Sequence, residues 1–117
     1  MNQGLAKAHK LKGYTAIRLL FEKGKSQRVA FLQLLSRENQ EAKHRMGFSV
    51  PKRRFKKAVD RNSLKRKMRE AYRRHKHLLR SDGPKMDSMI IYQKSEILDY
   101  KEIEEIIILI LKRLASQ

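Results

Sequence analysis

Cysteine and tryptophan are absent from this sequence of 117 residues, and acidic residues are scarce, with 12 Asp and Glu against 29 Lys and Arg. Without cysteine the chain has no disulfide framework and no cysteine-based zinc site, which suits a reducing compartment. Its longest apolar run covers residues 106–111, far short of the about 20 residues that a membrane-spanning helix needs. Residues 1–12 contain lysines and no apolar run, unlike a secretory signal. We therefore expect a cytoplasmic protein with no membrane partner.

The shortage of acidic residues is greatest in the middle of the chain. Residues 43–80 hold sixteen Lys and Arg and two acidic residues, Asp60 and Glu70, so this segment carries a net charge of +14 out of the total of +17. Residues 81–117 carry a net charge of −2. Charge concentrated in this way is typical of a surface that binds a polyanion, because phosphates bound by Lys and Arg release their condensed counterions. The pattern favours a nucleic acid as partner, and charge alone does not separate RNA from DNA.

Hydrophobic periodicity predicts one domain with a short N-terminal extension. Residues 1–12 are typical of a basic, loosely ordered arm, and residues 13–117 of a single domain. Within it we expect a helix over 14–23, strands over 28–36 and 45–50, a helix from Asp60 to about residue 80, a strand over 88–93 and a helix over 101–115. The polar residues 37–43 would join the first two strands as a hairpin. The order αββαβα indicates an α+β fold, a small two-layer sandwich of helices on a sheet.

The C-terminal element is predicted to be a helix from its spacing and its charges. Its apolar residues recur at helical spacing from Ile103 to Leu114. Asp99 with Glu102 three residues later has the form of a capping box, and basic residues near the end complement the helix dipole. The β-branched run over residues 106–108 also fits a strand, but the length and the charge placement favour a helix.

The helix that begins near Asp60 separates apolar from cationic residues. Its apolar stripe consists of Leu64, Met68, Ala71, His75 and Leu78. On the opposite face a cationic ridge consists of Asn62, Arg66, Arg69, Arg73, Lys76 and Arg80, flanked by Arg61 and Lys65. Like charges at this spacing repel each other by roughly 0.3 kcal/mol per pair, so their retention predicts a polyanion that neutralises them. Arginine predominates, which suits bidentate contacts with phosphate, and Asp60 is the expected N-cap.

Two stretches of the sequence resemble the bacterial ribonuclease P protein component. Residues 58–73 (AVDRNSLKRKMREAYR) are similar to the family signature, which has an Ala-Val pair, an Arg-Asn-Arg core, a Lys-Arg pair and an Arg-Glu-aromatic-Arg ending. Residues 47–53 (GFSVPKR) resemble the strand and the Lys-Lys turn that precede it. The element order also agrees from about His9 to the C-terminus.

The sequence departs from the family pattern at a few positions. Ser63 stands where the family usually has the second Arg of its core, which removes one expected RNA contact. Residues 54–57 make the following loop one residue longer than in many members. Ile17 and Leu34 occupy positions that are often aromatic, so the capacity to stack nucleotides is smaller in this chain.

The resemblance implies a fold like the second domain of ribosomal protein S5, with an uncommon left-handed βαβ crossover. It also implies that the protein is a subunit of an endoribonuclease whose catalyst is RNA, and which removes the 5′ leader from precursor tRNA. The partners would be the ribonuclease P catalytic RNA and the leader of the precursor tRNA. Mg²⁺ held by RNA phosphates and water would be the cofactor. We expect the isolated protein to be monomeric.

The resemblance divides the RNA contacts between the basic helix and a cleft beside the first helix. The helix would bind the catalytic RNA through Arg61, Asn62, Lys65, Arg66, Arg69 and Arg73. The other predicted RNA-binding residues are Lys76, Arg54, and Lys52 and Arg53, of which the last two would belong to the surface that receives the leader. The cleft would bind the single-stranded leader through Ile17, Phe21, Phe31 and Phe48, since aromatic rings stack bases without reading their sequence. On the sequence alone the three phenylalanines fit the hydrophobic core better, and the resemblance alone favours the cleft.

The sequence does not indicate that the polypeptide catalyses a reaction or holds a metal. Asp60 and Glu70 lie too far apart on their helix to form an acid pair. The four histidines have no ligand partners at suitable spacing. We therefore predict no catalytic residue and no metal-binding residue in the protein.

Three other functions fit part of the pattern. A ribosomal or other structural RNA-binding protein would share the charge and the small α+β fold, and the spacing within residues 58–73 argues against it. A DNA-recognition helix presents several Asn, Gln or Ser side chains among its basic ones, whereas this ridge has Asn62 alone. A membrane-surface helix would carry larger apolar residues than Ala71 and His75 on its stripe, and tryptophan beside them.

Overall fold

The structure is a computed structural model, and it describes residues 14–79 and 82–116. Its elements in chain order are α1 (Tyr14–Lys23), β1 (Lys25–Val29), β2 (Leu32–Glu38), β3 (Arg45–Ser49), α2 (Ala58–His75), the 3₁₀ turn η2 (Lys76–Leu78), β4 (Met86–Tyr92) and α3 (Tyr100–Ala115). The predicted α+β class is confirmed, with one strand more than in the predicted order. The arm expected over residues 1–12 lies outside the described residues.

The four strands form one sheet in the order β1-β2-β4-β3. β2 pairs antiparallel with β1 and β4, whereas β3 and β4 are parallel. A parallel pair needs a crossover connection, and α2 with its preceding loop supplies it. The predicted hairpin between residues 28–36 and 45–50 is therefore wrong. β4 lies between β2 and β3, and this central position leaves it buried along its whole length.

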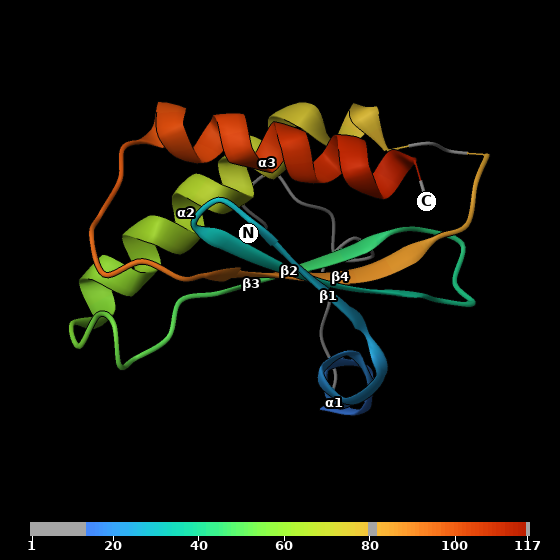
Figure 1. Cartoon of the computed structure of the whole chain (residues 1–117), viewed down its shortest axis with the longest axis horizontal. Coiled ribbons are helices and arrows are strands. Elements are labelled where there is room, and N and C mark those ends of the chain that lie inside the picture. The colour runs from blue at the N-terminus through green and yellow to red at the C-terminus, as the bar shows by residue number, and fades with distance from the viewer. Residues whose placement is uncertain (1–13, 80–81, 117) are drawn as a thin grey trace.

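Helices cover both faces of the sheet. Side chains alternate between the two faces along each strand, so neighbouring residues of β2 and β4 enter different cores. Leu34 and Ile90 pack beneath α2 and α3 in the main core, while Leu35 and Ile91 contact Leu20 of α1 in a smaller one. Figure 1 shows α1 on the opposite side of the sheet from the other two helices. The predicted two-layer sandwich thus gains a partial third layer.

The strand expected over residues 28–36 is a hairpin. β1 and β2 pair with Val29 opposite Leu32, so Ala30 and Phe31 form a two-residue turn. Ala30 has a φ of 55°, a conformation that residues other than glycine adopt at some cost. Such turns usually contain Gly, Asn or Asp, and here an apolar pair stands in their place. The sequence therefore lacked the signal that would have divided the strand.

The two long helices begin in different ways. α3 begins with Asp99 as its N-cap, and the side chain of Asp99 accepts a hydrogen bond from the backbone N–H of Glu102 at 2.9 Å, as the capping pattern predicted. α2 begins at Ala58, and its N-cap Lys57 makes no side-chain capping bond. The prediction of Asp60 as N-cap is therefore wrong. Asp60 lies in the first turn, where its negative charge still complements the helix dipole.

Candidate nucleic-acid interface

Helix α2 presents the predicted cationic ridge on the side away from the core. Its buried side holds Leu64, Met68, Ala71 and Tyr72, which belong to the main core. The described members of the ridge are Asn62, Arg66, Arg69, Arg73 and, in η2, Lys76, and these and the flanking Lys65 are all exposed or partly exposed. Arg80, which was expected to extend it, lies outside the described residues. Apolar packing thus fixes the helix and turns its cations outward.

The first two turns of the ridge surround a shallow hollow. Asn62, Lys65, Arg66 and Arg69 line it, and its volume is about 420 Å³. Over residues 14–79 and 82–116, no ion pair or hydrogen bond of the protein engages the three cationic side chains. We call these four residues the α2 hollow. Cations that have no internal partner give up no internal bond when they bind phosphate, so the hollow is suited to a nucleic-acid backbone.

Glu70 neutralises the C-terminal half of the ridge. Its carboxylate accepts hydrogen bonds from Arg73 Nε at 3.0 Å and from Arg73 Nη2 at 2.6 Å, and it lies 3.7 Å from Arg74 Nε. The bond from Arg73 lowers the pKa of Glu70, and the same bond raises the pKa of Arg73. Arg73 would have to share or leave this carboxylate in order to bind RNA, whereas Arg66 would not.

Arg61 tethers the loop between β3 and α2 to the start of the helix. Its Nη1 donates hydrogen bonds to the backbone carbonyls of Phe55 and Lys56 at 2.8 and 2.9 Å. Phe55 is buried, and its ring packs edge-on against that of Tyr92 with centroids 5.9 Å apart. The loop is therefore held both by the core and by α2. Arg61 retains other N–H groups, so its contact with RNA stays a prediction.

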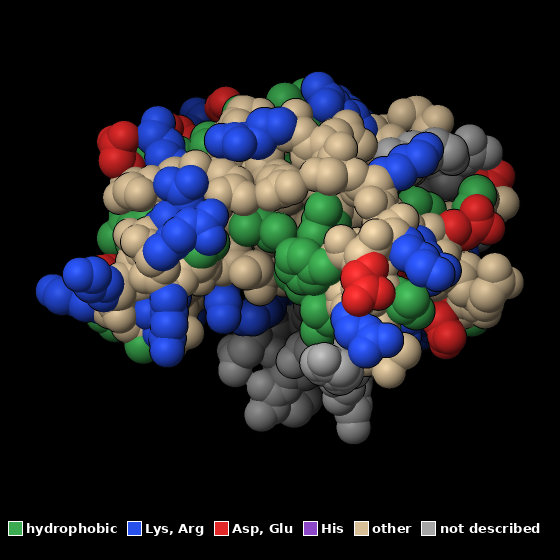
Figure 2. Space-filling view, turned by 60° about the horizontal axis from the view of Figure 1, so that its bottom comes forward, with side chains coloured by type: hydrophobic (Ala, Val, Ile, Leu, Met, Phe, Trp, Pro, Cys, Tyr) green, Lys and Arg blue, Asp and Glu red, His purple; other side chains and the backbone are tan. Residues whose placement is uncertain are grey.

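The same loop carries a second group of cations. Lys52, Arg53, Lys56 and Lys57 are exposed, and Lys and Arg side chains gather at the left of Figure 2, where this loop lies. Arg54 points inward instead and donates hydrogen bonds to two side chains beyond the end of β4, at 3.3 Å each. Of the three loop residues predicted to bind RNA, Lys52 and Arg53 therefore face solvent, while Arg54 is engaged by the protein.

The structure does not bring the four predicted leader-binding residues together. Ile17 and Phe21 belong to α1, and the side chain of Phe21 is 55% exposed. Phe31 and Phe48 pack against the main core, where their rings lie 5.6 and 6.1 Å from those of two buried tyrosines. Phe48 stands beside Ile90, whose side chain points toward α2 and α3. A single cleft formed by all four residues is therefore ruled out, because the strand pleat sends Phe48 to the other face.

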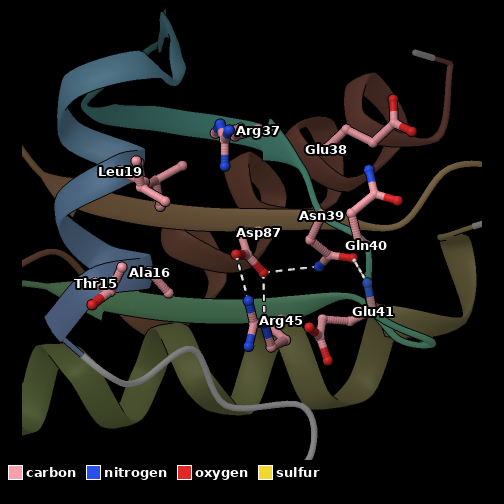
Figure 3. A pocket seen from close by; sticks show the side chains of 11 residues that line it. Thr15, Ala16, Leu19, Arg37, Glu38, Asn39, Gln40, Glu41, Arg45 and Asp87 are labelled. Atoms are coloured by element: carbon pink, nitrogen blue, oxygen red, sulfur yellow. Dashed lines mark hydrogen bonds and ion pairs between the residues drawn. The ribbon is translucent and has the colours of Figure 1, made fainter.

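A polar pocket that the sequence did not indicate lies beside the N-terminal half of α1 (Figure 3). It has a volume of about 320 Å³, and Thr15 and Arg37 are among its lining residues. Asp87, only 7% exposed, accepts hydrogen bonds from Arg45 Nε and Nη2 at 2.7 Å each and from Asn39 Nδ2 at 2.8 Å. The bond to Asp87 raises the pKa of Arg45. Both carboxylate oxygens of Asp87 therefore accept hydrogen bonds. Arg45 and Asp87 lie far apart in the sequence, so no local sequence pattern could have predicted that they pair.

The described part of the chain offers a binding surface rather than a metal centre. Within residues 14–79 and 82–116, no three His, Asp or Glu side chains come together as metal ligands. His75 Nε2 lies 2.8 Å from Glu104 Oε2 of α3 instead. No helix in these ranges has the length and apolar character needed to cross a membrane. The groups available for function are cations, amides and exposed rings.

Sequence comparison identifies relatives of this chain. The model of the Ribonuclease P family matches residues 5–115. The ribonuclease P protein component of Porphyromonas gingivalis is 43% identical over 79 residues, which cover 65% of this chain and 58% of that relative. The match thus spans less than two thirds of that relative's length. The ribonuclease P protein component of Thermotoga maritima is 32% identical over 120 residues, which cover 97% of this chain and 98% of the relative.

Solved structures agree with the sequence relatives. The ribonuclease P protein of Thermotoga maritima superposes with a TM-score of 0.76 at 31% identity, over 89% of this chain and 96% of that one. The protein of Staphylococcus aureus superposes with a TM-score of 0.76 at 28% identity, over 92% of this chain and 95% of that one. The similarity therefore extends over nearly the whole domain.

Proposed function

The chain belongs to the ribonuclease P protein family, and from this premise we propose that it is the protein subunit of a ribonucleoprotein that removes the 5′ leader from precursor tRNA. The RNA subunit carries out the cleavage, and the protein binds RNA. The observation that carries the proposal is the α2 hollow on a firmly packed helix, where Lys65, Arg66 and Arg69 have no hydrogen-bond or ion-pair partner within residues 14–79 and 82–116. Such a surface positions a folded RNA through its phosphates.

Two surfaces divide the RNA contacts in this proposal. The α2 hollow and the exposed cations of the loop between β3 and α2 hold the catalytic RNA. The exposed ring of Phe21, beside Ile17 on α1, stacks a base of the single-stranded leader. Phe31 and Phe48 take no part in leader binding, because they pack against the main core.

We place the magnesium of the complex on RNA. Residues 14–79 and 82–116 do not form a metal-ligand cluster, and phosphate oxygens and water are the ligands that Mg²⁺ prefers. In this proposal the polypeptide does not hold the magnesium ion. In the same proposal the protein acts in the cytoplasm. It binds RNA as a monomer, since both RNA-contacting surfaces lie on one chain.

The test is leader removal at low magnesium. Purified protein is mixed with a bacterial ribonuclease P RNA and labelled precursor tRNA, and the rate of 5′ leader release is measured. We expect the protein to stimulate release, and the double variant Arg66→Ala/Arg69→Ala to lose most of the stimulation with an unchanged circular dichroism spectrum. Lys101→Ala/Lys112→Ala removes two exposed charges from α3 and serves as control. A folded parent protein that stimulates no such RNA would overturn the proposal.

A further inference from the structure

Glu70 divides the cationic ridge of α2 into two parts. Before it along the helix, Arg66 and Arg69 have no hydrogen-bond or ion-pair partner in the described part of the chain. After it, Arg73 donates hydrogen bonds to both carboxylate oxygens of Glu70, from Nε to Oε1 at 3.0 Å and from Nη2 to Oε2 at 2.6 Å. The ridge thus offers free guanidinium groups in its first part and an occupied one in its second. The function proposed above gives Glu70 no role.

The carboxylate of Glu70 takes the place of a phosphate on Arg73. Two parallel N–H···O bonds between a guanidinium and an anion are the arrangement that arginine also makes with phosphate. The side chains of Arg73 and Glu70 are 39% and 40% exposed, so RNA can reach the pair. A phosphate that approaches Arg73 must displace the carboxylate or lie close to it, and two anions in close proximity repel each other. Glu70 therefore makes phosphate binding at Arg73 unfavourable.

Glu70 controls one cation of the ridge rather than several. The hydrogen bond from Arg73 lowers the pKa of Glu70, so the carboxylate is ionised at neutral pH. Arg74 Nε lies 3.7 Å from the same carboxylate. However, Arg74 Nη1 also donates a hydrogen bond to the Tyr100 hydroxyl at 3.4 Å and lies 4.0 Å from Glu104 Oε2. Without Glu70, Arg74 would keep its contacts with α3, and Arg73 would be free to bind phosphate.

We infer that Glu70 determines specificity, because it withholds Arg73 from the phosphates of RNA that does not fit α2. The inference rests on the proposed function, which makes α2 the surface that binds ribonuclease P RNA. A net charge of +17 attracts any RNA, and a protein selects its partner by penalising wrong ones as well as by favouring the right one. Unstructured RNA moves its phosphates to whichever cations are free. A folded RNA holds its phosphates at fixed positions, binds the α2 hollow and leaves the bond between Arg73 and Glu70 intact.

The test compares a folded RNA with an unstructured one. Affinities of the parent and of Glu70→Gln, which keeps the side-chain size and removes the charge, are measured for a ribonuclease P RNA and for polyuridylate. We expect Glu70→Gln to bind polyuridylate about two- to fivefold more tightly, the upper part of the range for an exposed ion pair. Its affinity for ribonuclease P RNA should stay within about 1.5-fold of the parent, because Arg73 makes no phosphate contact there. The salt dependence for polyuridylate should steepen by about 0.7 in logarithmic slope, which corresponds to one further phosphate contact.

Two comparisons separate this role from general charge and from helix stability. Glu105→Gln removes the same charge from an exposed position on α3 and should keep the ratio of the two affinities. In an Arg73→Ala background, adding Glu70→Gln should leave the ratio unchanged, because the cation that Glu70 withholds is gone. A carboxylate that only stabilised α2 would alter urea denaturation and would leave the ratio of the two affinities as it is in the parent.

Two results would overturn the inference: a folded Glu70→Gln variant whose affinities for both RNAs change by the same factor, or a change in their ratio that persists without Arg73. Failure of the proposed function has a different appearance. In that case the parent itself would bind ribonuclease P RNA no more tightly than polyuridylate, whatever residue stands at position 70.

Discussion

Arg66 and Arg69 of the α2 hollow have no hydrogen-bond or ion-pair partner within residues 14–79 and 82–116, unlike Arg61 and Arg73 of the same helix. We expect Arg66→Ala to lower the affinity for ribonuclease P RNA by roughly tenfold or more, since one charge-assisted hydrogen bond contributes about 1.5–3 kcal/mol. Arg66→Lys should recover part of the loss, because lysine keeps the charge and cannot form a bidentate phosphate contact. Filter binding at fixed salt measures both. Equal affinity of Arg66→Ala and parent would remove this side chain from the interface.

Arg61, one turn earlier, is expected to act first on the fold. Arg61→Ala removes two hydrogen bonds that hold the loop before α2, so the free energy of unfolding should fall by about 1–2 kcal/mol. Urea denaturation measures the change. Arg66→Ala is the matched control and should shift the stability by less than about 0.5 kcal/mol. A variant at Arg61 as stable as the parent would show that the tether contributes nothing.

Helices α2 and α3 are joined at the element scale by a cluster of polar side chains. Glu104 Oε2 of α3 lies 2.8 Å from His75 Nε2 of α2, and it accepts a hydrogen bond from the Tyr100 hydroxyl at 3.3 Å. Arg74 Nη1 lies 4.0 Å from the same oxygen, and the Arg74 guanidinium lies 5.8 Å from the centre of the Tyr100 ring. The cluster lies where the two helices pack against each other, so it helps to fix the helix that bears the ridge.

The pH dependence of stability should report this cluster. The hydrogen bond to His75, followed by the bond from Tyr100, lowers the pKa of Glu104 below its ordinary value of 4.5. A carboxylate with a lowered pKa stabilises the fold above that ordinary value, and the contribution is lost as the pH falls through the lowered pKa. We expect Glu104→Gln to be less stable than the parent at pH above 4.5 and the difference to shrink below it.

Urea denaturation at a series of pH values measures this difference. Glu105→Gln is the matched control, because it removes the same charge from the same turn of α3 at an exposed position. A difference between Glu104→Gln and parent that stays constant as the pH falls would show that the cluster does not depend on the ionised carboxylate.

The whole molecule carries its charge unevenly, and this determines how binding should respond to salt. The logarithm of the RNA affinity should fall linearly with the logarithm of the salt concentration, with a slope of about −0.7 to −0.9 for each phosphate contact. Arg66→Ala/Arg69→Ala should reduce the slope by about 1.5 units. Lys101→Ala/Lys112→Ala, which loses the same charge from α3, should leave it unchanged. Equal slopes for the two double variants would mean that net charge, rather than the α2 hollow, determines binding.

Prediction from the sequence succeeded for features that depend on near neighbours. The bounds of α1 agree with the prediction, and Asp99 caps α3 as expected. The cationic ridge faces away from the core, because helical spacing alone separates Leu64 and Met68 from Arg66 and Arg69. Prediction failed where the sequence lacks a turn signal. The turn at Ala30 has no Gly, Asn or Asp, so the hairpin of β1 and β2 was predicted to be a single strand.

The sequence by itself determined the family, the α+β class, the amphipathic helices and the concentration of charge on one of them, since each depends on residues at most a few turns apart. The tertiary structure alone decided which strands are neighbours, that Phe48 faces the main core, and that Arg45 meets Asp87. These are contacts between residues that the chain brings together from a distance. These contacts depend on the central position of β4 and on the alternation of side chains between the two faces of the sheet. The spacing of residues within a single helix or strand does not reveal which strands become neighbours.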